Sequence, residues 1–565
     1  DVTASAGRGG QWLIDPYDIA IEAVPNSSNI TTSPPYVATG SPSILSNTAL
    51  AQFLNYTTAG AVIVDATSAQ GSDSGTITVN AQIAATPLLA SGSTLELRAN
   101  KDVTINATIS SGGNPLNLRL LADQDDDGTG KVTWGSGWLD LKGGQAQVLK
   151  GTSLQGTEPG DLFVTGATIA TTEPSPALAT GTSLLTGTLT VAQGATLDVS
   201  SVATSSATAT DSFIVQGETV LAGSLSIHGG LVSFEGAINS SGAAGSLSQL
   251  GGTMTLYQPV NLEAFTFSGG TLQGSASTGT GSLNVNGIFD RTGGSVAGGS
   301  LQGLVLRQVD TDLNPGSWDV TGAIVLQTLA GGVQIDGGIR GSTILVESSG
   351  GITLGSAARL VATSTQSDPT LLLSAVSGPF VNQASTSPFV VASTSLWRVY
   401  SATPNSDTLG SLAFDYKAYG ISYPNTPPTG LSGSGLLYSA TPQVAVGLVG
   451  SVSKEYDGSA TATLTASNYQ LAGVVQGDSV DVAYPLEGVY GAGGSPAGAP
   501  QDVGTDKPVT VTGLQVLSAT ATNGAGVTVP VSGYQLTNSG INATIGTITA
   551  KQLVGSFTAA DKVYD

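Results

Sequence analysis

Apolar and small polar residues alternate in short runs along most of the chain, from about residue 75 to residue 364. Three such runs begin at Gly75, Thr94 and Thr188, and Gly, Asn or Asp residues separate the runs. A period of two with glycine between the runs predicts short strands that bury one face. Because the runs continue for hundreds of residues without helical intervals, they predict a solenoid whose strands stack from rung to rung.

We therefore expect an all-β protein, a parallel β-helix followed by a β-sandwich-like module. With about 20 residues per rung, a stretch of about 400 residues would form about 20 rungs and a rod on the order of 100 Å long. A string of small β-sandwiches is the alternative fold, and the repeat spacing before about residue 430 favours it less.

Breaks in the alternating pattern suggest domain boundaries. Prolines interrupt residues 22–60, where a short helix is predicted around Leu45 to Asn55, and glycine pairs are frequent in residues 200–330. The predicted segments are a β-helix with a loop decoration at 22–60 (1–199), a continuation with an inserted or laterally packed β region and candidate functional head (200–330), the last rungs with an aromatic cap or junction (331–442), a compact β module (443–550), and the start of a second copy of that module (551–565).

The second copy is inferred from a repeated tetrapeptide pattern. Lys454-Glu-Tyr-Asp recurs as Lys562-Val-Tyr-Asp at an offset of 562 − 454 = 108 residues. No signal peptide opens the chain, so Asp1 is expected to begin a fragment or a processed form.

Composition narrows the function classes. Only 10% of the 565 residues are charged, 77 are glycine and 40% are hydrophobic, which disfavours both a helical enzyme and a disordered chain. The net charge of -22 argues against nucleic acid as a partner. The chain has no cysteine, so it has no disulfides and no thiolate sites, which fits a secreted protein that is exported unfolded. No apolar run approaches 18 residues, and we expect no membrane span.

One acidic segment has the residue types of a calcium loop. Asp123, Asp125, Asp127 and Thr129 alternate with other residues around Gly128, an arrangement that converges oxygen ligands on a hard cation. An EF-hand would need Glu where Trp134 stands, so a bidentate ligand would have to come from elsewhere in the chain. Calcium is a candidate cofactor, and an acidic turn between rungs is the alternative. No other cofactor is expected.

Tryptophans are candidate carbohydrate platforms, because the faces of their rings stack on sugars. Trp134, Trp138 and Trp318 are the candidates, and packing within the coil is the alternative that the pattern favours. His228 is the sole histidine, and it lies beside a glycine pair, so we predict no catalytic residues and no enzyme activity.

Several segments resemble a known family. Residues 9–19 (GGQWLIDPYDI), 75–81, 95–109 and 118–125 resemble filamentous-haemagglutinin-type exoproteins of two-partner secretion (TpsA-like adhesins, and CdrA-like biofilm adhesins among them). Residues 400–412 and 437–439, Tyr456-Asp-Gly, Val503-Gly-Thr and residues 533–537 resemble the family's junction and its YDG/MBG-type repeats.

The resemblance implies a right-handed parallel β-helical stalk followed by YDG/MBG-type modules. It implies a secreted or cell-surface adhesin of the biofilm matrix, which contacts exopolysaccharide or a cell-surface glycan and other bacterial cells, and which an outer-membrane two-partner transporter exports. Two alternatives stay open. One is a β-helical polysaccharide lyase or hydrolase that uses the Asp123–Asp127 cluster, and the other is a purely structural stalk whose adhesive site lies outside these residues.

Overall fold

The structure, a computed structural model, describes most of the chain. The described residues are 17–56, 61–67, 73–90, 92–122, 124–125, 130, 132–134, 139–142, 146–150, 162–165, 168–171, 182–185, 189–191, 196–199, 212–215, 217–227, 231–240, 245–277, 280–491, 501–562 and 564.

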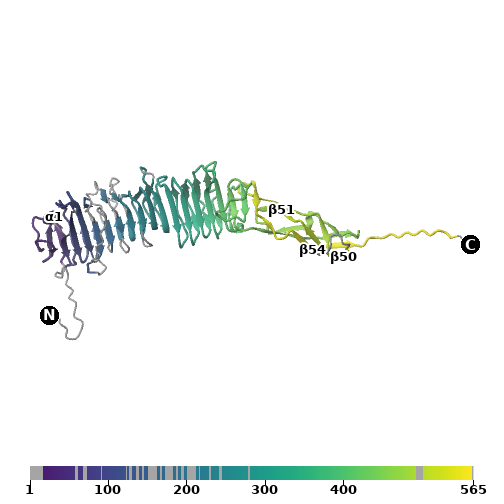
Figure 1. The fold of residues 1–565 in the computed structure, drawn as a ribbon, viewed down its shortest axis with the longest axis horizontal. Coiled ribbons are helices and arrows are strands. Elements are labelled where there is room, and N and C mark those ends of the chain that lie inside the picture. Colours follow the sequence, from purple (N-terminus) through teal and green to yellow (C-terminus); the bar gives the residue numbers. More distant parts are fainter. Residues whose placement is uncertain are drawn as a thin grey trace, which may run out of the picture. The chain divides into compact units, whose positions relative to one another are not determined.

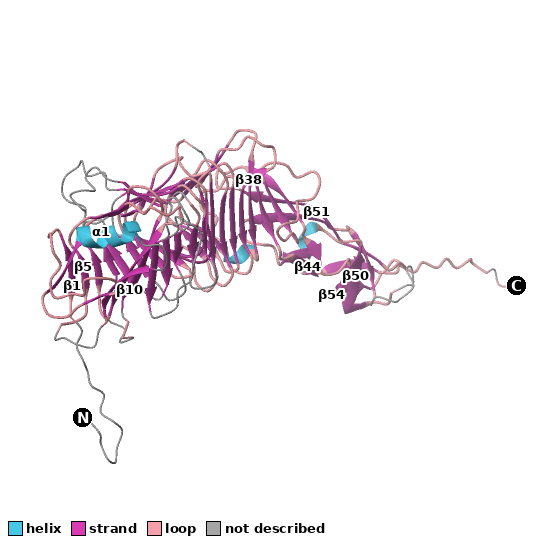
Figure 2. Ribbon diagram, turned by 60° about the vertical axis from the view of Figure 1, so that its left-hand side comes forward, coloured by secondary structure: helices cyan, strands magenta, loops and turns pink. Residues whose placement is uncertain are grey.

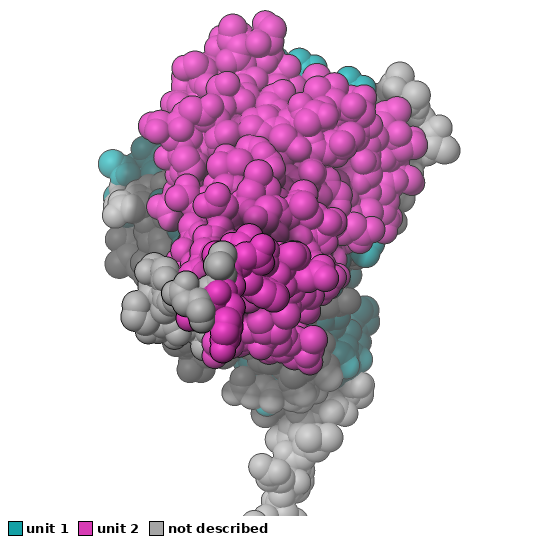
Figure 3. All heavy atoms as spheres, turned by 90° about the vertical axis from the view of Figure 1, so that its right-hand side faces the viewer, with its two compact units in different colours: residues 1–348, 357–364 teal, residues 349–356, 365–565 magenta. Residues whose placement is uncertain are grey.

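The chain divides into two compact units (Figure 3). Unit 1 comprises residues 1–348 and 357–364, and unit 2 comprises residues 349–356 and 365–565. Almost all regular elements in the described part of both units are strands, as the alternating pattern predicts.

Parallel strands form unit 1, and each strand pairs with a strand about 20 to 30 residues away along the chain. Figure 1 shows these strands side by side in chain order. Two long series are joined by the long strand β26 (Pro259–Phe267), which pairs with a strand of each series, and β28 (Ser282–Arg291) pairs with both halves of β26. The arrangement is consistent with a parallel β-helix.

In the first series, each strand pairs with the strand named after it in the next sentence. Its members are β2 (Tyr36–Val37), β4 (Ala61–Ala66), β7 (Ser93–Ala99), β10 (Leu116–Ala122), β13 (Ala146–Lys150), β14 (Leu162–Thr165), β17 (Leu189–Val191), β20 (Thr219–Leu221), β23 (Ile238–Ser240), β26, β28, β30 (Gly303–Gln308), β32 (Ile324–Thr328) and β35 (Ile344–Ser348).

The second series runs beside the first and ends on β26 and β28. Its other members are β3 (Ser43–Ser46), β1 (Ile19–Glu22), β5 (Ile77–Val79), β8 (Val103–Ile105), β11 (Val132–Trp134), β15 (Thr168–Thr171), β18 (Thr196–Val199), β21 (Ser224–Ile227) and β24 (Ser246–Gln249).

Shorter parallel groups complete unit 1. They are β6 (Ile83–Ala85), β9 (Ile109–Ser111) and β12 (Leu139–Asp140); β16 (Thr182–Leu185), β19 (Ser212–Val215), β22 (Leu231–Phe234), β25 (Thr253–Leu256), β27 (Thr271–Gly274) and β29 (Ser295–Val296); and β31 (Trp318–Asp319), β34 (Gly338–Gly341) and β37 (Arg359–Ala362). The strand β33 (Val333–Ile335) forms an isolated bridge to Leu313.

Alternate side chains of these strands form columns. In the register, Leu304 lies opposite Ile324 and Ile324 opposite Ile344, and all three are buried. The side chains that alternate with these buried residues point outward and form polar ladders from strand to strand. Arg307 Nε donates to Gln327 Oε1 (2.8 Å), and Gln327 Nε2 donates to Glu347 Oε2 (2.8 Å). The column of apolar side chains is the core, since every inward residue packs against its equivalents above and below.

Residues 22–60 contribute more than the predicted loop decoration. They supply β2 and β3 to the two series, and helix α1 (Asn47–Tyr56) lies where the sequence predicts a short helix. The helix buries Leu50, Ala51 and Leu54 and lies against β3, β6 and β7, along one side of the strands in Figure 2. The two segments between the prolines are long enough to pair as strands. The many prolines of this region had instead suggested a loop.

Described strands within residues 200–330 all belong to the two parallel series or to the shorter parallel groups, and the glycine pairs mark stacked turns. A Cβ on Gly269 would lie 2.1 Å from Leu250 O. Gly294 has φ +70° and lies against the ring of Phe267, where a Cβ would come within 2.2 Å. Because close approach between turns explains these glycines, they require no separate lateral domain.

The first part of unit 2 also consists of parallel strands. β36 (Ile352–Leu354) pairs with β39 (Phe380–Asn382), and β38 (Pro369–Ala375) pairs with β41 (Leu396–Ser401). The next strand in space is β43 (Gly435–Tyr438), and β42 (Tyr416–Tyr419) follows it, so the chain order of these two strands is reversed. In chain order, the strand β40 (Phe389–Val391) comes between β39 and β41, and a 3-10 turn, η1 (Pro404–Ser406), comes between β41 and β42.

β42 and β43 are buried along their whole length. Tyr400, Tyr416, Ala418 and Leu437 form an apolar cluster, against which Leu372, Ile421, Tyr423 and Leu431 pack. The proline-rich loop between the two strands thus supplies Ile421, Tyr423 and Leu431 as a cover. The aromatic residues that the sequence assigned to a cap or junction are largely in this core.

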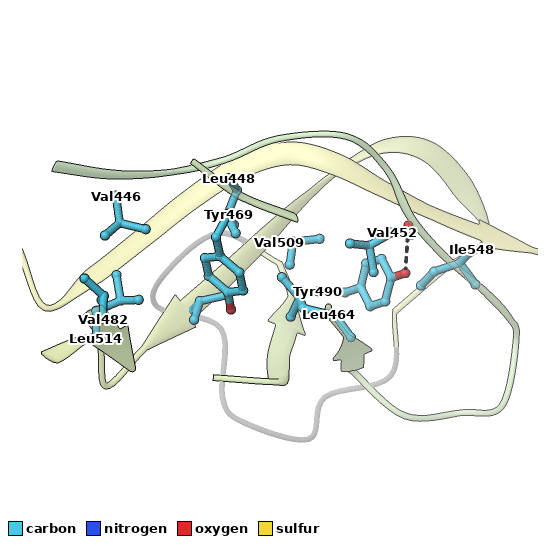
Figure 4. Packing of buried hydrophobic residues seen from close by; sticks show 12 residues of the cluster. Val446, Leu448, Val452, Leu464, Tyr469, Val482, Tyr490, Val509, Leu514 and Ile548 are labelled. Atoms are coloured by element: carbon cyan, nitrogen blue, oxygen red, sulfur yellow. Dashed lines mark hydrogen bonds between the residues drawn. The ribbon is translucent and has the colours of Figure 1, made fainter. Parts of the chain in front are cut away.

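The rest of unit 2 is an antiparallel and mixed β module with its own core (Figure 4). Its elements are β44 (Gln443–Leu448), β45 (Val452–Glu455), β46 (Thr461–Thr463), η2 (Ala466–Asn468), β47 (Tyr469–Ala472), β48 (Asp478–Ala483), β49 (Glu487–Tyr490), β50 (Gly504–Thr512), β51 (Gln515–Thr522), β52 (Thr528–Ser532), β53 (Gln535–Leu536) and β54 (Gly540–Thr549).

One five-stranded sheet has the order β45, β54, β50, β49, β46, and a three-stranded sheet has β44 at its centre. Tyr490, with a fully buried side chain, donates its hydroxyl proton to Val452 O (3.1 Å) in this core, the hydrogen bond drawn in Figure 4. Residues 550–562 after β54 are exposed and form no strand.

Candidate functional site

The predicted calcium loop lies almost wholly outside the described residues. Asp123, Asp127 and Thr129 are not described, while Asp125 lies in a turn and is exposed. The described part of the chain contains no group of three or more His, Asp or Glu residues that could hold a metal ion. Calcium at this loop stays a prediction. His228 is also outside the described residues.

The predicted carbohydrate platforms fall in different environments. Trp134 ends β11, but its side chain, like the whole of Trp138, is outside the described part. Trp318 is only 2% exposed and donates from Nε1 to Pro315 O (2.7 Å). The Arg291 guanidinium carbon lies 5.2 Å from its ring centre. A ring enclosed in this way offers no open face to a sugar, so the carbohydrate hypothesis rests on Trp134 and Trp138.

The first of the two Lys-x-Tyr-Asp segments, which continues into Gly458, forms a turn that Lys454 closes. Asp457 Oδ1 accepts hydrogen bonds from Lys454 Nζ (2.8 Å) and from the Ser459 amide (2.8 Å). Lys454 Nζ also donates to Ser459 O (2.7 Å). Gly458 has φ +77°, a conformation that glycine adopts without strain. Lys454 and Asp457 therefore hold this turn closed from within the segment.

Charge is balanced within this turn. The Lys454 ammonium, and then the Ser459 amide and hydroxyl, hold the pKa of the Asp457 carboxyl below its usual range. Lys454 Nζ also lies 5.5 Å from the ring centre of Tyr490. Tyr456 is 37% exposed, so the turn presents an aromatic side chain at the surface beside a neutralised pair.

A second polar cluster lies inside unit 2, where β42 pairs in parallel with β52. Through β42 one sheet runs in the order β38, β41, β43, β42, β52, β51, β48. Two further hydrogen bonds join the same segments, from Asn523 Nδ2 to Phe414 O (2.8 Å) and from the Gly524 amide to Leu412 O (2.8 Å). The parallel strands and the β module of unit 2 therefore share one sheet.

The junction cluster consists of Lys417, Tyr419, Asp478 and Tyr534. Lys417 Nζ lies 2.8 Å from Asp478 Oδ1, and their side chains are 6% and 0% exposed. Asp478 Oδ2 accepts hydrogen bonds from the hydroxyls of Tyr419 (2.5 Å) and Tyr534 (2.8 Å). Both carboxylate oxygens thus have partners, which a buried charge requires.

The tyrosines around this carboxylate stay protonated. Burial is the main cause of a raised pKa at the hydroxyls of Tyr419, Tyr438 and Tyr534, and the Asp478 carboxylate raises each of them further. The two phenols that contact Asp478 are therefore hydrogen-bond donors across the whole physiological range. The Tyr534 hydroxyl in turn accepts from the Val475 amide (3.0 Å).

Sequence reasoning missed the junction cluster. A signal was present, since Lys417 stands among Phe414, Tyr416 and Tyr419, and a lysine in an aromatic run needs a buried acid. Nothing local identified that acid, because Asp478 is 61 residues away.

Comparison with known families finds a match to the YDG domain over residues 441–525. This range overlaps the segment that the sequence assigned to a YDG/MBG-type module, and it includes Lys454, Asp457 and Asp478. The YDG domain indicates an adhesion-type or binding-type role. No curated protein and no solved structure matches the chain. No helix among the described residues is both long and apolar enough to cross a membrane.

Proposed function

We propose that this chain is part of a bacterial extracellular adhesin of the biofilm matrix. In this proposal the parallel strands wind as a right-handed β-helix that acts as a rigid spacer, and the YDG domain follows it. The proposal places the chain outside the cell, as a filamentous-haemagglutinin-type exoprotein that a two-partner transporter of the outer membrane exports.

The observation that supports a spacer is the register of unit 1. Strand after strand pairs in parallel with its equivalent about 20 to 30 residues on, and the buried columns and outward ladders repeat with it. Each repeat is stabilised by its neighbours, so the structure extends by addition of repeats and resists bending. The match to the YDG domain supports the binding role.

Exopolysaccharide or a cell-surface glycan is the proposed ligand, and neighbouring bacterial cells are the proposed partners. An extended surface with repeated weak contacts binds by avidity and needs no deep pocket. The low content of charge and the abundance of hydroxyl side chains favour neutral polymers over polyanions. The proposal gives the chain no catalytic role.

A glycan array tests the proposal, with the full chain displayed at high density on fluorescent beads. We expect retention on at least one class of polysaccharide and none on glycan-free spots, with no new reducing ends in the bound polymer. Beads that neither bind any glycan nor clump with each other would contradict the proposal and leave a structural stalk.

A deletion of one repeat provides the matched control. Without residues 324–343, Ile344 takes the place of Ile324 opposite Leu304, as the register allows. We expect this variant to bind glycans as the complete chain does, because a spacer tolerates the loss of one repeat. Loss of binding would place the contact site within that repeat.

A further inference from the structure

We propose that Lys417 and Asp478 condense into an amide bond, which crosslinks β42 covalently to the YDG domain. The reacting groups are already in contact, with 2.8 Å between Lys417 Nζ and Asp478 Oδ1. The lysine side chain is 6% exposed and the aspartate side chain is fully buried. Nothing in the YDG match assigns a modification to either residue.

The reaction balances without any other reactant. The amine nitrogen of Lys417, after transfer of a proton to the carboxylate, attacks Cγ of Asp478. The C–N bond forms and one C–O bond breaks. The two protons that the ammonium gives up leave with that oxygen as one water molecule, and the third stays on the amide nitrogen. An ion pair becomes a neutral amide, with no oxidant, reductant or cofactor.

Burial favours the product over the ion pair. Two charges removed from water lose their hydration, and their attraction seldom restores all of it. An amide between the same side chains removes both charges. The Phe414 ring, with its centre 5.6 Å from Lys417 Nζ, and Tyr419 add to the apolar surroundings of the amine.

The fold also holds the carboxyl group in position for attack. The hydroxyls of Tyr419 and Tyr534 both donate to Oδ2, which leaves Oδ1 toward the lysine. These hydroxyls also stabilise the negative charge that develops on a carboxyl oxygen in the tetrahedral intermediate. Groups fixed in this way react as if at concentrations of about 10⁵ M or more, which overcomes the weak reactivity of a carboxylate in water.

Strand pairing keeps the two backbones in place. Lys417 lies opposite Val531 in the parallel pair of β42 with β52, and Asp478 lies opposite Ala521 at the start of β48. β51 joins the two pairs, because it bonds both to β48 and to β52. The crosslink would span the sheet that the parallel strands share with the YDG domain, so a pull on the chain would load a covalent bond.

The chain contains its own matched control. Lys454 and Asp457 are also 2.8 Å apart, but the side chain of Asp457 is 54% exposed and the residues are only three apart in sequence. Water solvates that pair. The hydrogen bonds that Asp457 accepts come from Lys454 and Ser459 and not from a tyrosine hydroxyl. We expect no condensation there.

Intact-mass spectrometry of the denatured full chain tests the proposal. We expect the wild type to be lighter than its sequence by one water molecule. Lys417→Arg and Asp478→Ala should each show the full sequence mass, and Lys454→Arg should keep the deficit of the wild type. Asp478→Asn should still condense, with loss of one ammonia molecule in place of water.

Peptide mapping locates the bond and decides the case even where a variant fails to fold. In the wild type, trypsin should not cut after Lys417, and one fragment should contain both residue 417 and residue 478. A wild-type chain with the full sequence mass, cut normally after Lys417, would overturn the proposal. Neither readout depends on glycan binding, so the crosslink and the adhesin proposal can fail separately.

Discussion

Asp407 is a partly buried carboxyl in the parallel part of unit 2. Its Oδ1 accepts from the Phe380 amide (2.8 Å) and from Ser401 Oγ (2.8 Å). Burial nevertheless raises the pKa of this carboxyl from 3.8 to about 6, while these hydrogen bonds, Tyr438 and the charge of Lys417 oppose the change. Folding therefore favours the protonated form.

The stability of unit 2 should fall as the pH rises from about 4 to about 6. In that window the folded state binds the Asp407 proton and the unfolded state does not, so the contribution is complete below pH 3.8 and lost above pH 6. Its size is about 2 to 3 kcal/mol. Urea unfolding at several pH values measures it, and Asp407→Asn, which keeps an acceptor, should flatten the curve in this window. An unchanged slope in the variant would contradict the assignment.

Gly435 is a second single residue on which packing depends. A Cβ there would lie 2.2 Å from Cζ of the Tyr416 ring, which covers this glycine from the neighbouring strand. We expect Gly435→Ala to lower the free energy of unfolding by about 1 to 3 kcal/mol, because the buried ring must move. Thermal unfolding measures the change.

Gly338→Ala is the control for that substitution, since a Cβ at Gly338 meets nothing within 4 Å. It should change stability by less than about 0.5 kcal/mol. Equal effects of the two substitutions would show that the Tyr416 contact is not the cause.

At the scale of elements, polar ladders join successive strands of unit 1 on their outer surface. Asn261 Nδ2 donates to Asn239 Oδ1 (2.9 Å), and Asn284 Nδ2 donates to Asn261 Oδ1 (2.9 Å). In this register Asn261 donates to the asparagine of the preceding strand and accepts from the asparagine of the following strand, so the ladder selects the register as well as stabilising it.

Asn261→Ala should remove both bonds and lower the free energy of unfolding by about 1 to 2 kcal/mol. The urea midpoint of the full chain measures this loss. Leu329→Ala, at a side chain that is 57% exposed, is the control and should shift the midpoint little. A ladder that contributes nothing would give the same midpoint in both variants.

At the scale of the whole molecule, the low content of charged residues and the excess of acidic over basic ones govern association between copies of the chain. Asp and Glu number 39 against 17 Lys and Arg, so copies of the chain carry a net charge of -22 and repel one another. At 0.15 M salt this repulsion acts over only about 8 Å, and the hydroxyl-rich surfaces can then approach.

Self-association of the chain should therefore increase with ionic strength. We expect dynamic light scattering to detect larger particles at about 0.5 M than at about 0.01 M sodium chloride, because screening shortens the range of repulsion. Replacement of sodium chloride by the same concentration of sucrose would control for effects of the added solute. Clumps that dissolve as salt rises would instead indicate association through ion pairs.

The sequence by itself determined the local structure. Alternation with a period of two predicted short strands with one buried face, and glycine predicted the turns between them. These features depend on neighbours within a few residues, so the local pattern contains the information. The composition, with abundant glycine and few charged residues, also disfavoured a helical fold.

Only the tertiary structure decided which strands meet. The pattern of β42 and β43 gives no reason for β43 to insert before β42, and nothing near Lys417 identifies Asp478 as its partner. Trp318, a candidate carbohydrate platform for which the sequence favoured packing within the coil, is enclosed by Pro315 and Arg291, partners that no local pattern identified. Burial and pairing depend on segments distant in sequence, and the free energy of packing selects among partners that local alternation leaves equivalent.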